Sequence, residues 1–77
     1  MPQLQQTVHR GTVTWRGAPV RVTARFTTLL PEPTGHLDCR QQFPVGMGMP
    51  LRLDDERGTL VVIVGPDNHF LAVRPLE

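Results

Sequence analysis

The sequence has no Lys, Ser or Tyr, one Cys and few aromatic residues, and these shortages exclude particular kinds of site. Without Ser there is no serine hydrolase site. Cys39 alone cannot form an intramolecular disulfide and has no second thiolate for a metal cluster. No window approaches the roughly 18 apolar residues of a membrane-spanning helix, and the longest purely apolar run, 60–64, has the length of a strand. We therefore expect neither a membrane partner nor a disulfide scaffold.

Length and composition predict one small domain over residues 1–77. A chain of this size buries only about 60% of the surface that its unfolded form exposes, so the core is modest. An apolar fraction of 39% with 19% charged residues is ordinary for a globular protein. Residues 1–6 lack the basic and hydrophobic regions of a signal peptide. We expect them to form a flexible N-terminal arm, and we expect the protein to be cytoplasmic.

Strand-like runs dominate the pattern. No stretch sustains helical apolar spacing, and eight Pro and seven Gly interrupt the chain. The pattern predicts an all-β fold, a small antiparallel barrel or sandwich of about five to six short strands, SH3-like or OB-like. The expected strands are 7–16, 20–30, 36–43, 51–53, 59–64 and 69–74. The expected breaks are a turn at 17–19, a loop at 31–35, a loop or bulged strand at 44–50, and turns at 54–58 and 65–68. Residues 59–64 are apolar on both faces and should form the most buried strand.

The first two runs predict a hairpin with a definite register. Pairing Trp15 opposite Val20 separates a largely apolar face from a polar one, as in a half-buried antiparallel hairpin. On the apolar face the predicted pairs are Val13 with Val22, Gly11 with Ala24, and His9 with Phe26. On the polar face they are Thr14 with Arg21, Thr12 with Thr23, and Arg10 with Arg25, with Arg16 at the turn.

The polar face is the candidate binding surface. Net charge is only +1, but residues 1–30 carry four Arg and no acid, +4, and residues 31–77 carry four Arg against seven acids, −3. Guanidinium and hydroxyl groups on an open face suit phosphates, so we expect an anionic partner, nucleic acid or an acidic protein surface. Trp15 and Phe26 fall on the predicted core side, which leaves phosphate contact dominant over base stacking. The expected contact residues are Arg10, Arg16, Arg21, Arg25, Thr12, Thr14 and Thr23.

Two alternatives stay open. The Arg side chains could simply form a solvated face, paired with acids such as those at 54–56. The protein could also be a self-associating assembly protein, a homo-oligomer, because the core is small, the run 60–64 is apolar on both faces, and the two halves carry opposite charge.

No enzyme site is expected. His9, His36, His69, Cys39 and Asp38 are the residues with metal or nucleophile potential beyond simple carboxylates, and none of them has a spacing that pre-orients ligands. We predict no catalytic residue, no metal and no cofactor, and leave open whether the three His converge. Cys39 is interpreted as a small buried apolar residue.

One short spacing resembles a motif of a known family. Arg21 and Arg25 have the Arg-x-x-x-Arg spacing that PilZ domains, also small barrels, use for cyclic di-GMP. The family's second motif, Asp/Asn-x-Ser-x-x-Gly, has no counterpart, because the segment that begins Asp38-Cys39-Arg40 lacks both Ser and Gly. No family is assigned on this spacing.

Overall fold

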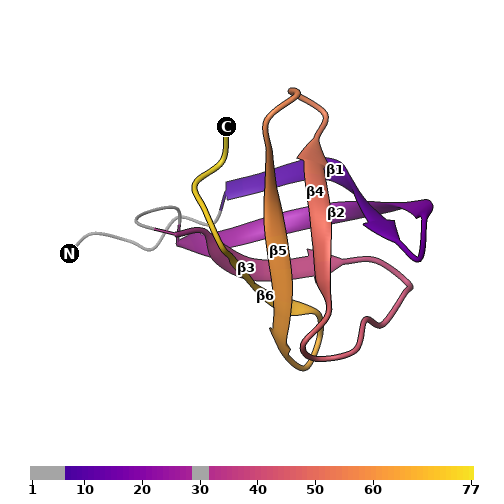
Figure 1. The fold of residues 1–77 in the computed structure, drawn as a ribbon. Coiled ribbons are helices and arrows are strands. Elements are labelled where there is room, and N and C mark those ends of the chain that lie inside the picture. The colour runs from indigo at the N-terminus through magenta and orange to yellow at the C-terminus, as the bar shows by residue number, and fades with distance from the viewer. Residues whose placement is uncertain (1–6, 29–31) are drawn as a thin grey trace.

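Six strands make up the regular structure of residues 7–28 and 32–77, which the computed structural model describes (Figure 1). They are β1 (Thr7–Trp15), β2 (Ala18–Thr28), β3 (Thr34–Asp38), β4 (Gly48–Leu53), β5 (Gly58–Gly65) and β6 (His69–Ala72). All neighbours are antiparallel, in the order β1-β2-β3-β6-β5-β4, and β4 pairs again with β1. The all-β prediction is confirmed, and the sheet closes into a barrel rather than a sandwich.

Some predictions fall outside this description. The expected N-terminal arm, residues 1–6, and the end of the expected second strand, 29–30, lie outside the described residues. Within the described part of the chain, no helix is long and apolar enough to cross a membrane.

The first hairpin turns at Arg16 and Gly17, so the predicted turn at 17–19 is wrong. Both residues have positive φ, 51° and 79°, the combination of a type I′ turn, whose twist matches that of the flanking strands. Trp15 therefore lies opposite Ala18 instead of Val20, a register shift of two residues. Pro19 can lie within β2 because β3 pairs with β2 only from Thr23 onward. The missing backbone N–H of Pro19 therefore leaves no carbonyl of β3 without a hydrogen bond. Since side chains alternate with a period of two, each one stays on its predicted face.

Inward side chains from every strand, with Phe43 from the loop after β3, fill the barrel. Val13, Val22, Ala24 and Phe26 come from the predicted core face, and each is at most 4% exposed. Phe26 meets Phe70 edge to face with ring centroids 5.6 Å apart. The apolar face of the hairpin is therefore core, as predicted, whereas Trp15 and Val20 near the turn pack against it only partly buried.

The third strand is displaced from its predicted range, 36–43. It starts at Thr34, inside the predicted loop, and ends at Asp38. Gly35 permits the early start, because a Cβ there would collide with the carbonyl oxygen of Arg25 on the paired strand.

The side chain of Asn68 shapes the loop that follows β3. Asn68 is 2% exposed, accepts a hydrogen bond from the N–H of Phe43 at 2.8 Å and donates one to the carbonyl of Gln41 at 2.8 Å. These bonds hold Phe43 in the core although it is not in a strand. Cys39 lies in this loop, half-buried against the core, and burial raises the pKa of its thiol. The prediction of a buried apolar residue holds only in part, because the thiol packs against the core from a loop and also donates a hydrogen bond to the carbonyl of Gln41 at 3.2 Å.

Strand β5 is buried on one face only, which contradicts the prediction for 59–64. Thr59, Val61 and Ile63 point inward and are buried, whereas Leu60 and Val62 are partly exposed and Val64 is 53% exposed. A closed barrel has a single interior, so each strand can bury only alternate residues in it. The expected strand at 69–74 also ends early, at Ala72, and the expected break at 44–50 contains the first residues of β4.

Candidate anion-binding face

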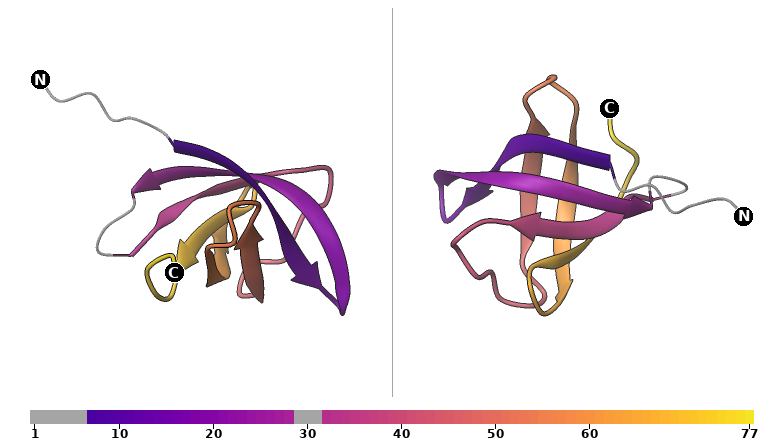
Figure 2. Two further views of the ribbon diagram at one scale, coloured as in Figure 1. Left: turned by 90° about the horizontal axis from the view of Figure 1, so that it is seen from above. Right: turned by 180° about the vertical axis from the view of Figure 1, so that it is seen from behind.

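The residues predicted to bind an anionic partner all lie on the outside of the first hairpin, and we call this surface the Arg/Thr face. Each is exposed or partly exposed, because the positions between them, such as Val13 and Val22, point into the core. The view from behind in Figure 2 looks onto this side of the barrel. The face consists of Arg10, Thr12 and Thr14 on β1, Arg16 in the turn, and Arg21, Thr23 and Arg25 on β2.

The corrected register changes which of these side chains are neighbours. The predicted pairs on this face are wrong. Instead, Arg10 lies opposite Thr23, Thr12 opposite Arg21, Thr14 opposite Pro19, and Val8 opposite Arg25. Directly opposed like charges repel, and in the observed register every Arg of the hairpin strands has an uncharged neighbour across the pair. Arg10 and Arg21 each therefore lie beside a Thr hydroxyl, whereas Arg25 lies beside Val8.

Closure of the barrel adds a residue that the sequence did not place on this face. Arg52 lies opposite Thr12 in the β1–β4 pair, and Arg21 lies opposite Thr12 on the other side. Arg52 is exposed and forms no ion pair within residues 7–28 and 32–77. Arg52 stands between the buried Leu51 and Leu53 and points outward, and the pairing of β4 with β1 places it beside Thr12.

Arg21 is partly neutralised by an acid from the β4–β5 turn. Its guanidinium donates to both carboxylate oxygens of Asp54, at 2.8 and 2.9 Å, and to the hydroxyl of Thr12 at 3.2 Å. The hydrogen bond from Arg21 lowers the pKa of Asp54 below its ordinary value. The side chains are 61% and 54% exposed, so water and salt screen the pair and another anion can compete with Asp54.

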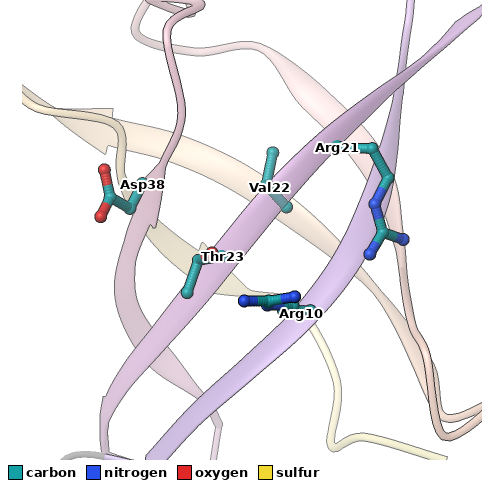
Figure 3. Close-up of a pocket in the computed structure, with 5 residues that line it drawn as sticks. All are labelled: Arg10, Arg21, Val22, Thr23 and Asp38. Carbon is teal, nitrogen blue, oxygen red and sulfur yellow. The ribbon is translucent and has the colours of Figure 1, made fainter.

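Arg10 lines a shallow hollow of about 260 Å³ together with Arg21, Val22, Thr23 and Asp38. Figure 3 shows Arg10 reaching from β1 toward Thr23 on β2, and Arg21 reaching the other way. Arg10 forms no ion pair within the described residues, and Asp38 is engaged with Arg25 at 3.4 Å. With Arg10, Arg16, Arg21, Arg25 and Arg52 against Asp38 and Asp54, five positive and two negative charges leave this surface at +3.

The turn places Arg16 over the indole of Trp15, with the guanidinium carbon 4.9 Å from the ring centroid. Trp15 in turn meets Phe43 edge to face at 5.3 Å. Arg16 on one side and the core on the other therefore both contact the indole, which is partly buried.

The histidines do not all meet. His36 and His69 are directly opposite in the β3–β6 pair, with ring centroids 5.7 Å apart, and Nδ1 of His69 lies 3.0 Å from the carbonyl oxygen of Pro66. His9 packs instead against Phe26, with ring centroids 5.8 Å apart. Within the described ranges no three His, Cys, Asp or Glu side chains are arranged to hold a metal ion.

In comparisons with known proteins, no family model, no curated protein and no solved structure matches this chain. The case for a function therefore depends on the geometry of the Arg/Thr face and the surfaces around it.

Proposed function

We propose that this protein is a cytoplasmic, non-enzymatic binding module that contacts the phosphate backbone of nucleic acid with the Arg/Thr face and Arg52. One observation carries the proposal: Arg10, Arg21 and Arg52 stand on three strands that are neighbours in the barrel, interleaved with Thr12 and Thr23. Arg10 and Arg52 have no acidic partner in the described part of the chain, so their charge is available to a ligand.

Phosphate is the anion that this arrangement suits. A guanidinium presents a rigid fork of donors that matches phosphate oxygens, and Thr hydroxyls add neutral donors between the charges. Contacts of this kind are made whatever the base sequence. Because these contacts go to phosphates and not to base edges, we expect binding without sequence preference, with a slope of log K against log salt of about −3 for three to four phosphate contacts.

The test compares Arg10→Glu with Arg40→Glu in fluorescence-anisotropy titrations of a labelled oligonucleotide. Both residues are exposed and outside any ion pair of the described residues, but Arg40 lies in the loop after β3 and does not line the hollow beside Arg10. We expect Arg10→Glu to weaken binding by about tenfold or more and to reduce the salt slope by about 1, and Arg40→Glu to do much less.

The double variant Arg10→Glu with Arg52→Glu should bind the oligonucleotide still more weakly than Arg10→Glu alone. Its circular dichroism spectrum should be unchanged, which would show that the fold is intact. Equal effects of Arg10→Glu and Arg40→Glu would contradict the proposal. If the oligonucleotide fails to bind but polyglutamate binds with the same dependence on Arg10, the partner is an acidic protein surface instead.

A further inference from the structure

The outside of β5 and its two neighbouring strands is apolar, in contrast to the outside of the first hairpin. Pro50 of β4 lies opposite Leu60 of β5, and Val62 of β5 lies opposite Leu71 of β6. Val73 follows β6 and donates its N–H to the carbonyl of Leu60, so it continues the same surface. We call the surface formed by these residues the apolar outer face: Pro50, Leu60, Val62, Val64, Leu71 and Val73.

This face contains no charged residue, and parts of it are well exposed. Val64 is 53% and Val73 48% exposed, and Leu60, Val62 and Leu71 are partly exposed. Aliphatic side chains that stay in contact with water forgo the stabilisation that burial gives. A continuous surface of this kind, as opposed to scattered single residues, is typical of an interaction site.

Gly48 is an exposed position of β4 at the edge of this face. It lies opposite Val62, and a Cβ built there would have Cγ2 of Val62 at 4.0 Å and the carbonyl oxygen of Val61 at 3.9 Å as its nearest neighbours. The φ of Gly48 is not in the left-handed region, so other residues can adopt its backbone. A side chain at position 48 would therefore project from the face without disturbing the barrel.

The charges at one end of the face indicate what the partner is. Arg52, Glu56, Arg74 and Glu77 line a hollow of about 400 Å³ beside Gly58 and Thr59. Two positive and two negative side chains together complement a second copy of the same surface when it is turned about a two-fold axis. A partner of one dominant charge has no such match here.

We propose that the apolar outer face is the interface of a symmetric homodimer. In it Leu60, Val62 and Leu71 pack against the same residues of a second copy, and Arg74 pairs across the axis with Glu56 or Glu77 of the second copy, which leaves Arg52 to the Arg/Thr face. A head-to-tail contact between this face and the Arg/Thr face is disfavoured, because it would remove guanidinium groups from water without an acidic partner. Figure 1 has β4 and β5 toward the viewer and the rear view in Figure 2 has β1 and β2, so the dimer leaves both Arg/Thr faces open.

Sedimentation of the full chain over a wide concentration range tests this proposal, with Gly48→Glu compared to Thr14→Glu. Both substitutions add a carboxylate at an exposed strand position, the first on the apolar outer face and the second on the Arg/Thr face. The wild type and Thr14→Glu should approach twice the monomer mass of 8.6 kDa. Gly48→Glu should associate on the order of 100-fold more weakly, since it buries a charge with no partner.

Val64→Glu provides a second variant in case Gly48→Glu fails to fold, because Val64 is half exposed. A wild type that stays monomeric at the highest concentration overturns the proposal, as does a dimer that survives both Gly48→Glu and Val64→Glu. Dissociation by Thr14→Glu instead would place the interface on the Arg/Thr face. A monomer that binds lipid vesicles through Val64 would identify a membrane as the occupant. None of these outcomes depends on nucleic acid binding.

Discussion

The two outer surfaces of the barrel are built by the same alternation of side chains but present opposite chemistry. Outward residues of β1 and β2 are mainly Arg and Thr, whereas those of β5 and β6 are mainly Leu and Val. Both sets of strands supply equally apolar residues to the interior, such as Val13 and Phe26 on one side and Val61 and Ile63 on the other. Folding therefore explains the inward residues of all four strands, and only the outward residues need a further explanation.

The largest effect should be the difference in stability between substitutions of an inward and of an outward side chain of β5. Ile63→Ala removes a fully buried side chain and should lower the free energy of unfolding by about 3 kcal/mol, because it leaves a cavity. Val64→Ala, one residue along, should change it by no more than about 0.5 kcal/mol in the monomer. Urea denaturation at low protein concentration measures both. Similar losses from the two variants would mean that Val64 is also part of the core.

A smaller effect should come from releasing Arg21 on the Arg/Thr face. Asp54→Asn removes the acid that binds this guanidinium. It should tighten oligonucleotide binding about 2- to 5-fold, the strength of an exposed ion pair, and steepen the salt slope by up to about 1. Asp55→Asn is the matched control, because it makes the same charge change but frees Arg57 in the β4–β5 turn. If both variants tighten binding equally, net charge alone governs affinity and the proposed role of Arg21 is wrong.

The smallest effect should be on how far the stability of the fold decreases at acidic pH. Hydrogen bonds from Arg21 and Arg57 lower the pKa of Asp54 and of Asp55, respectively. A carboxyl whose pKa is lower in the folded than in the unfolded state stabilises the fold above its unfolded pKa, and this contribution is lost as pH falls through the folded pKa. The urea midpoint of the wild type should therefore drop as pH is lowered through and below about 3.9. Asp54→Asn should show a shallower drop, and an identical drop would show that the exposed pair contributes nothing.

Much of the fold could be read from local pattern, with clear limits. Alternation placed Val13, Val22, Ala24 and Phe26 in the core, and the Gly- and Pro-rich breaks located most of the strands. The register of the first hairpin could not be read in this way, because it depends on the backbone twist of the turn at Arg16 and Gly17. Nor could the end of β3, since a distant side chain, that of Asn68, sets the path of the loop after it.

The candidate site, too, could be predicted from the sequence only in part. The outward Arg and Thr residues of the hairpin were identified in the sequence, because a period of two is a local property that survives a shift of register by two. Pairing of these Arg residues with acids at 54–56 was an alternative expectation, and the contact of Arg21 with Asp54 bears it out. Only the tertiary structure brought Arg52 beside Thr12, since this contact requires β4 to close the barrel against β1. It also decided that Leu60, Val62 and Val64 face outward. The sequence shows that both sides of β5 are apolar, but a closed barrel has one interior, so only one side of the strand can be buried in it. Which side is buried depends on the closure of the whole barrel and not on the strand alone.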